Sequence, residues 1–166
     1  KVRGSAEYVA DIQRPRTLYG AVLRSPWAHA RIRSIDVRAA LALPGVHAAI
    51  TSADTPKQPW GGFRRAPYAL AVDKVRFVGE EDAAVAAVDL HTAREAIKLI
   101  AVDYEELPPL YSVDEALAPG APLVHDDAPG NVAYAFRTDE GDVDDGFARS
   151  DVIVEGTWET GRQWHA

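Results

Sequence analysis

The sequence predicts a mixed α+β domain, with a sheet of short strands and two or three short helices. Three observations favour this class. Hydrophobic residues make up 47% of the 166-residue chain, which is enough to bury a core. Runs of alternating or β-branched residues indicate strands, whereas other runs combine helical spacing with capping residues. These elements alternate irregularly through short connections, which favours α+β over a doubly wound parallel sheet.

Seven stretches have the composition or the alternation of a strand and are bounded by turn residues. Pro26 ends the first of them, because proline lacks an amide donor and holds Ser25 extended. Gly79 follows the fourth and permits a sharp turn or a bulge. In chain order, the predicted strands are residues 17–23, 30–37, 46–51, 74–78, 83–88, 102–105 and 152–158.

Helices are predicted in three places, with a weaker fourth. The most regular begins at Thr92, which with Glu95 forms a capping-box pattern, and its apolar residues recur at helical spacing. Ser112 and Glu115 repeat the capping pattern, and Asp36 stands where the first helix needs an N-cap. The predicted helices are residues 37–43, 92–100, 112–118 and, weakly, 142–150. Residues 52–68, rich in proline and glycine, are predicted to form a long functional or mobile loop.

Composition and charge exclude several functions. The chain has no cysteine, so it supplies no disulfide, thiolate nucleophile or iron–sulfur ligand. Its net charge of −7 argues against nucleic-acid binding. The charge is divided, with 13 basic and 8 acidic residues in 1–83 but 5 and 17 in 84–166. This division predicts a basic and an acidic face or a docking surface, unless the two halves interleave and their fields cancel. We find neither a membrane span nor a secretory signal and expect a cytoplasmic protein.

Motif searches find no self-sufficient active site. The sequence lacks the glycine-rich phosphate-binding motifs, the Gly-x-Ser-x-Gly elbow and the His-Glu-x-x-His pair. Ser25, His29 and Asp36 could be drawn as a triad, but nothing in their spacing requires one. We therefore predict no catalytic residue and no metal ligand in this chain.

An ordered set of segments resembles one family. The first is Leu23-Arg24-Ser25-Pro26-Trp27-Ala28-His29-Ala30-Arg31-Ile32, followed by Ser34-Ile35-Asp36; others are residues 43–46, 70–80, 102–108, 130–132 and 141–143. This order is similar to that of the molybdenum hydroxylases, the family of xanthine dehydrogenase, aldehyde oxidase, carbon monoxide dehydrogenase and 4-hydroxybenzoyl-CoA reductase. The resemblance implies the N-terminal α/β-hammerhead domain of the large subunit over residues 1–150. Residues 151–166 would begin the following molybdopterin-binding domain.

In one place the sequence departs from the family pattern. After Gly79-Glu80 the family continues Pro-Val-Ala, whereas this chain has Glu81-Asp82-Ala83. An acidic residue thus replaces an apolar strand residue. We expect either that the strand starts later than usual or that its neighbour in the full enzyme differs.

The resemblance also implies a function. The intact protein would be a molybdenum-dependent oxidoreductase acting on aromatic, heteroaromatic or aldehyde substrates. The similarity of residues 125–131 to 4-hydroxybenzoyl-CoA reductase adds an aromatic acyl-CoA reductase to these possibilities. Later domains of the large subunit would hold the molybdenum-molybdopterin cofactor. Iron–sulfur clusters and FAD on partner domains or subunits would carry the electrons. This chain would bind no cofactor itself and would be inactive alone.

A docking role toward those later domains or the iron–sulfur partner is therefore the functional expectation. The candidate docking residues are Arg24, Ser25, His29, Arg31 and Arg33. Three alternatives stay open. The same residues could form a structural strand–turn–strand corner. The chain could be a stand-alone binding module of the same fold that uses the 52–68 loop. It could also be a small hydrolase that uses Ser25 and His29.

Overall fold

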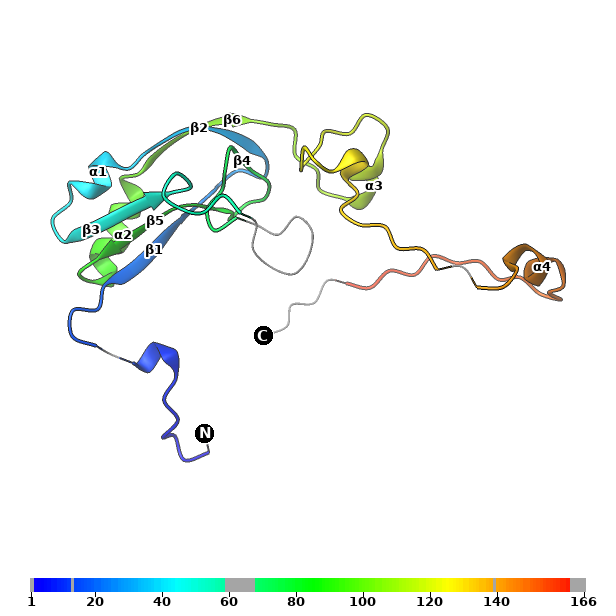
Figure 1. Cartoon of the computed structure of the whole chain (residues 1–166), viewed down its shortest axis with the longest axis horizontal. Coiled ribbons are helices and arrows are strands. Elements are labelled where there is room, and N and C mark those ends of the chain that lie inside the picture. Colours follow the sequence, from blue (N-terminus) through cyan, green and yellow to red (C-terminus); the bar gives the residue numbers. More distant parts are fainter. Residues whose placement is uncertain (1, 13, 59–67, 139, 162–166) are drawn as a thin grey trace. The chain divides into compact units, whose positions relative to one another are not determined.

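The computed structural model describes residues 2–12, 14–58, 68–138 and 140–161. Contacts divide the chain into two units, residues 1–134 and 135–166. The described strands all belong to the first unit and form two three-stranded antiparallel sheets (Figure 1). Among the described residues, no helix combines the length and apolar character that a membrane crossing requires.

The first sheet has β5 (Glu81–Ala87) at its centre, between β1 (Tyr19–Arg24) and β3 (Val46–Thr51). Helix α2 (Leu90–Lys98) packs on β1 and β5, and α1 (Arg38–Leu41) packs on β3. Small side chains at the interface allow the helices to approach the sheet closely. The buried core consists of Ala40, Ala83, Val85, Ala96 and Ile100.

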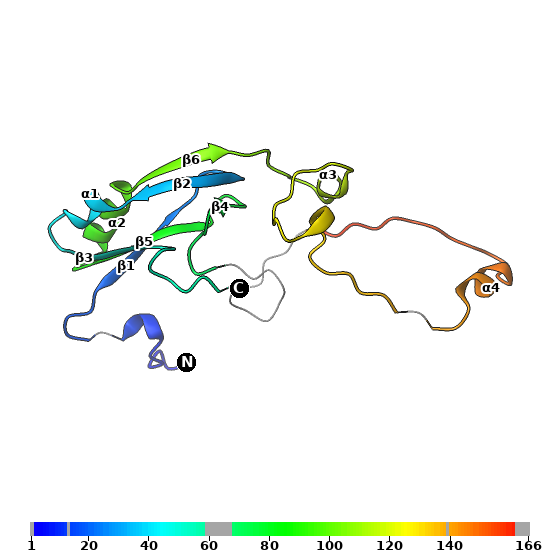
Figure 2. The ribbon, with the colours of Figure 1, turned by 45° about the horizontal axis from the view of Figure 1, so that its top comes forward.

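The second sheet has β2 (Ala30–Asp36) at its centre, between β4 (Lys74–Val75) and β6 (Ala101–Glu106). Figure 2 shows β2 and β6 running side by side above the sheet of β1, β5 and β3. Ile32 and Tyr104 pack against the buried side chains of this sheet, which are Ala30, Ala71 and Val75. The chain passes from one sheet to the other through residues 25–29.

Short elements complete the two units. In the first unit these are the 3-10 turns η1 (Val9–Asp11) and η2 (Pro129–Asn131), and α3 (Val113–Leu117), which Ser112 caps. In the second unit, α4 (Val143–Ala148) is capped by Asp142. The α+β class and the strands near residues 17–23, 30–37, 46–51 and 102–105 are thus confirmed.

Two strand predictions were wrong in extent, and a third was wrong altogether. The predicted strand over 74–78 stops at Val75, because the Arg76 amide donates to the Glu80 carboxylate instead of a neighbouring strand. The strand predicted from residue 83 starts earlier, at Glu81, so Asp82 lies inside it. Residues 152–158 form no strand, and no strand partner for them lies among the described residues.

Two predicted helix caps were also wrong. The N-cap of α2 is Asp89, whose carboxylate accepts from the Thr92 amide at 2.7 Å, so Thr92 lies inside the helix. The first helix begins one residue later than predicted, with Val37 at the N-cap position and Asp36 accepting from the Arg38 amide. In both cases an aspartate one turn or less before the helix competes for the first free amides. Residues 59–67 of the predicted 52–68 loop lie outside the described residues.

Candidate functional site

The loop that joins the two sheets carries two of the five candidate docking residues, Ser25 and His29. Hydrogen bonds hold this loop against the turn before β5: the Ser25 amide donates to the Glu80 carbonyl at 2.9 Å, and the Gly79 amide donates to the Ser25 carbonyl at 2.8 Å. The Ser25 hydroxyl accepts from the Trp27 amide at 3.0 Å, which fixes the turn around Pro26. The buried Ser25 side chain is therefore part of the turn structure.

Arg24 reaches the same turn from the end of β1. Its guanidinium donates to the Gly79 carbonyl at 2.7 Å and to the Glu81 carboxylate at 2.6 Å. The side chain is about half exposed, so this ion pair stays in contact with water. Arg24 thus ties the end of β1 to the start of β5, while part of its surface remains open.

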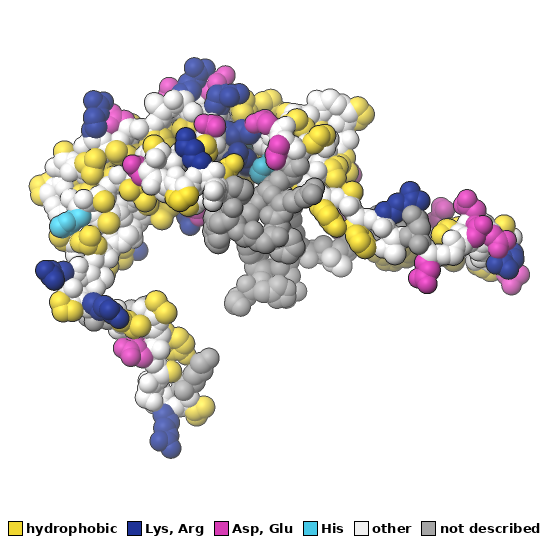
Figure 3. All heavy atoms as spheres, in the orientation of Figure 1, with side chains coloured by type: hydrophobic (Ala, Val, Ile, Leu, Met, Phe, Trp, Pro, Cys, Tyr) yellow, Lys and Arg dark blue, Asp and Glu magenta, His cyan; other side chains and the backbone are white. Residues whose placement is uncertain are grey.

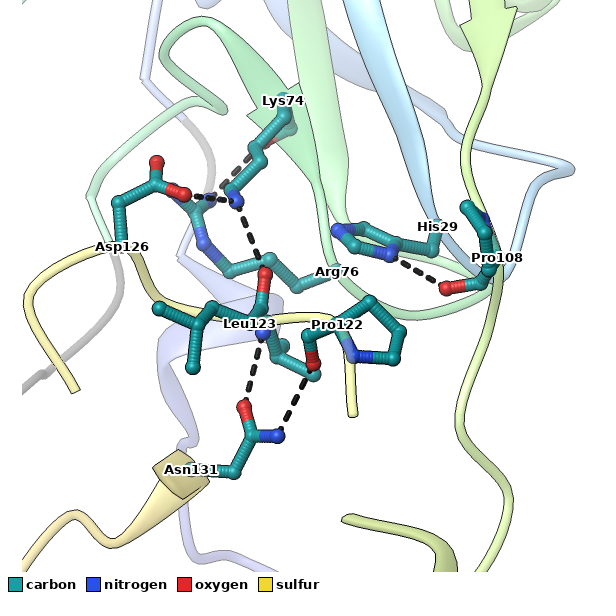
Figure 4. A network of polar contacts seen from close by, with 9 residues as sticks. His29, Lys74, Arg76, Pro108, Pro122, Leu123, Asp126 and Asn131 are labelled. Carbon is teal, nitrogen blue, oxygen red and sulfur yellow. Dashed lines mark hydrogen bonds and ion pairs between the residues drawn. The ribbon is translucent and has the colours of Figure 1, made fainter. Parts of the chain in front are cut away.

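His29 fastens the loop to the segment that follows β6. The Leu107 amide donates to the His29 carbonyl at 2.9 Å, and the imidazole Nδ1 lies 2.9 Å from the Pro108 carbonyl oxygen (Figure 4). Because a carbonyl oxygen only accepts, Nδ1 must carry the proton. His29 is 4% exposed, and among the described residues its Nε2 has no hydrogen-bond partner. His29 therefore acts here as a buried brace between two chain segments.

Arg31 and Arg33 lie on the solvent side of β2. They share one acceptor, the Glu105 carboxylate on β6, at N–O distances of 3.5 and 3.2 Å. Each guanidinium is more than half exposed, and two positive charges face one negative charge. In Figure 3, basic and acidic side chains lie next to each other on the side of the molecule that carries β2 and β6. Arg31 and Arg33, like Arg24, therefore keep much of their side-chain surface open to a partner.

A buried carboxylate beside the loop connects the two sheets. Asp82 lies on β5 at a register shift, since Leu23 of β1 pairs with Ala83 but Arg24 pairs with Glu81. Such a bulge redirects a side chain. The Asp82 side chain is completely buried and accepts a 2.5 Å hydrogen bond from the Tyr104 hydroxyl on β6, while no residue that the structure describes is a partner for its other oxygen. A polar bond therefore crosses from the first sheet to the second.

Burial shapes the protonation of this pair. It raises the pKa of Asp82 to about 6, against the opposing hydrogen bond from Tyr104, and the carboxylates of Glu80 and Glu81 add to the rise. Burial also raises the pKa of Tyr104 above its ordinary value. The Tyr104 hydroxyl accordingly stays protonated and donates a hydrogen bond to the Asp82 carboxylate.

A second buried pair lies on the turn between β4 and β5. Glu80 accepts from the Arg76 amide and from the Arg76 guanidinium, the latter at 3.2 Å, and both side chains are largely buried. Burial raises the pKa of Glu80, although Arg76 pulls it down. The Arg76 guanidinium also donates to the Lys74 carbonyl at 2.9 Å. These bonds replace the strand ladder that stops at Val75.

Lys74 fixes the segment after α3 onto β4. Its buried ammonium donates to the Leu123 carbonyl at 3.3 Å and to the exposed Asp126 carboxylate at 2.9 Å (Figure 4). The Asn131 side chain stabilises this segment. It accepts from the Val124 amide and donates to the Ala116 and Pro122 carbonyls. We call Lys74, Arg76, Glu80, Asp82 and Tyr104 the polar cluster.

Sequence reasoning singled out Asp82 but missed the other members of the polar cluster. The one available signal was a charged residue at the start of a predicted strand, Lys74, and another between two predicted strands, Glu80. Their partners lie too far away in sequence to be paired by inspection. Among the described residues, no group of three or more histidine, aspartate or glutamate side chains is placed to hold a metal ion.

Comparisons with known proteins define the class. The model of a known family, described as "Aldehyde oxidase and xanthine dehydrogenase, a/b hammerhead domain", matches residues 3–108. The chain is 40% identical over 166 residues to a probable xanthine dehydrogenase subunit of Bacillus subtilis, covering 99% of this chain and 22% of that protein. It is 38% identical to the carbon monoxide dehydrogenase large chain of Afipia carboxidovorans, covering 91% of this chain and 21% of that one.

The solved structures agree. The aldehyde oxidoreductase of Desulfovibrio gigas superposes with a TM-score of 0.73 at 32% identity, covering 91% of this chain and 18% of that chain. The chain therefore belongs to the aldehyde oxidase and xanthine dehydrogenase family, as its α/β-hammerhead domain. The predicted fold and family are thus confirmed. The chain spans only about a fifth of the length of the relatives named above.

Asp82 gives a pH-dependent prediction. Because the folded protein raises the pKa of this carboxyl from 3.8 to about 6, its contribution to stability is full below about pH 4 and is lost as the pH rises through 6. Asp82→Asn mimics the protonated form and accepts the same bond. Thermal unfolding should give similar midpoints for the two proteins near pH 4, and a higher midpoint for Asp82→Asn at pH 7.

The control for this prediction is Asp103→Asn, which changes an exposed carboxylate on β6. It should shift the midpoint equally at both pH values. If Asp82→Asn also gave the same shift at pH 4 and pH 7, a buried Asp82 carboxyl with a raised pKa would be contradicted.

Proposed function

We propose that these residues are the scaffold and docking domain of the large, molybdopterin-binding subunit of a molybdenum-dependent oxidoreductase. The substrate would be an aromatic, heteroaromatic or aldehyde compound, with 4-hydroxybenzoyl-CoA-type acyl thioesters as a further prediction. Iron–sulfur clusters and FAD on partner domains or subunits would carry the electrons, and the enzyme would act in the cytoplasm. The observation that carries the proposal is that nearly the whole chain aligns with only about a fifth of a probable xanthine dehydrogenase subunit.

The described residues do not fit a molybdenum-molybdopterin site. The buried charged side chains bind one another, as in Arg76 with Glu80, or bind the chain's own carbonyls, as Lys74 does. No group of metal-ligating side chains lies among residues 2–12, 14–58, 68–138 and 140–161. We therefore assign the cofactor to the rest of the subunit and derive no chemical step from this domain. What these residues do is hold loops and a charged surface in fixed positions.

The apolar pattern of residues 152–158 supports a second domain, with the boundary proposed near residue 151. Residues 152–158 have the apolar pattern of a strand, yet they pair with no described strand. Val152, Val154 and Trp158 are each more than three-quarters exposed. Such side chains are normally covered in a folded protein. A strand of the next domain would cover them.

Arg31 and Arg33 are the part of the proposed docking surface that lies on β2. Arg24, which is equally exposed, and the buried Ser25 and His29 hold the loop that precedes them. Two guanidiniums that share the Glu105 carboxylate leave a positive charge for a partner carboxylate. The shape of the loop depends on buried bonds, so the arginines are presented by a rigid support.

Metal analysis tests the proposed function directly. The full-length protein that contains this sequence, produced in cells supplied with molybdate, should hold stoichiometric molybdenum, because the later domains supply the site. Residues 1–166 alone, produced in the same cells, should hold none. Stoichiometric molybdenum in the isolated piece would refute the scaffold role, and a full-length protein without molybdenum would refute the enzyme class.

The docking surface is tested by the double variant Arg31→Ala/Arg33→Ala in the full-length subunit. An exposed charge pair is worth up to about 1 kcal/mol, and the shared Glu105 carboxylate leaves one net positive charge for the partner, so affinity for the iron–sulfur partner should fall about fivefold. Arg38→Ala is the matched control, because Arg38 is exposed but already paired with Asp36. The affinities can be compared by isothermal titration or by surface plasmon resonance. Equal affinity of the double variant and the wild type would count against docking through β2.

A further inference from the structure

A pocket of about 240 Å³ lies between the loop before β2 and the segment after β6. Pro26, Trp27 and Val78 line one side, and Glu106, Pro109 and Tyr111 line the other. Pockets for drug-sized ligands and cofactors measure roughly 300–1,000 Å³, so this one is better suited to a single side chain.

His29 holds the two walls of the pocket together. Its carbonyl accepts from the Leu107 amide and its Nδ1 proton points to the Pro108 carbonyl, both at 2.9 Å. Lys74 further restrains the chain beyond Tyr111, through Leu123 and Asp126. The pocket is therefore preformed, and an occupant would bind without first ordering these walls.

The chemistry of the walls favours a flat cation. Trp27 and Tyr111 offer aromatic surface, and Tyr111 is 76% exposed. Glu106 makes no ion pair among the described residues, whereas its neighbour Glu105 is occupied by Arg31 and Arg33. A guanidinium stacks on aromatic rings and pairs with a carboxylate at the same time, and it is less strongly hydrated than an ammonium.

We propose that this pocket receives an arginine side chain from a part of the same subunit that lies outside these 166 residues. The proposal rests on the proposed function, which supplies the remaining subunit. The relatives have about four-fifths of their length beyond the region that matches this chain, so the same polypeptide offers ample surface to cover the pocket. Val78, which lines the pocket, is exposed, as is its neighbour in sequence Phe77, so apolar surface is left open there, as expected for a covered interface.

Photo-crosslinking in the full-length protein tests the proposal. A benzophenone amino acid replaces Tyr111, whose exposure makes the change compatible with folding, and mass spectrometry identifies the crosslinked peptide. The expected product is an intramolecular crosslink to an arginine-containing peptide downstream of residue 166. Glu106→Gln should lower its yield about fivefold, the equivalent of one partly exposed ion pair. Asp103→Asn, an exposed carboxylate on β6, is the matched control and should leave the yield unchanged.

Several outcomes would overturn the proposal: no crosslink at Tyr111, a crosslink to a partner subunit or to a second copy, or a yield that Glu106→Gln leaves unchanged. The molybdenum content of the same sample separates this proposal from the proposed function. A molybdenum-loaded protein without the crosslink refutes the pocket assignment alone, whereas a protein without molybdenum refutes the proposed function.

Discussion

The hydrogen bond between Asp82 and Tyr104 is the interaction on which the arrangement of the domain depends. Each sheet has three strands and a small core, much of it alanine, so neither buries much apolar surface alone. The bond joins the centre strand of one sheet to an edge strand of the other. The loop of residues 25–29, which links the two sheets, lies beside this bond, and His29 contacts the segment after β6. Its position relative to β6 is therefore fixed by polar contacts as well as by packing.

Placing charge in such a position has a cost. A buried carboxylate loses hydration, and a hydrogen-bonded partner repays only part of that loss. Within the described part of the chain, one oxygen of Asp82 and one buried nitrogen each of Arg76 and His29 have no hydrogen-bond partner. Apolar side chains could fill the same space at a smaller cost in free energy, but they would not fix the orientation of the loops as directional hydrogen bonds do. We interpret the polar cluster as specifying how the loops are oriented, and the proposed docking surface and arginine pocket both need that orientation.

Local sequence patterns predicted most of the fold. Alternation identified β2 and β6, and helical spacing identified the buried face of α2, because both depend on residues close in sequence. The cap of α2 was misplaced by one turn, because Thr92 and Glu95 match the capping-box pattern, whereas the side chain that accepts from the first free amides in the structure is that of Asp89. The extent of β4 was overestimated, because the Glu80 carboxylate takes the Arg76 amide. A sequence pattern does not show that a side chain competes with a neighbouring strand for a backbone amide.

The candidate site was predicted less completely. The family signature identified candidate residues between positions 24 and 33. In the structure, Ser25 and His29 are buried and stabilise the loop, whereas the arginines are exposed. Asp82 was noticed as a departure from the family, yet its partner Tyr104 is 22 residues away on another sheet. Lys74 and Asp126 are 52 residues apart. Contacts across such separations are set by the folding of the whole chain, so no single-sequence pattern reports them.

The central claim is that a buried polar bond between the sheets positions the loops of this scaffold, and a double-mutant cycle measures that bond. The free energy of unfolding at pH 7 is determined for the wild type, Asp82→Ala, Tyr104→Phe and the double variant by urea titration. A direct hydrogen bond predicts a coupling energy of about 1–3 kcal/mol, with the two single losses exceeding the double loss. Losses that simply add would show that the two side chains do not interact, and would contradict the account.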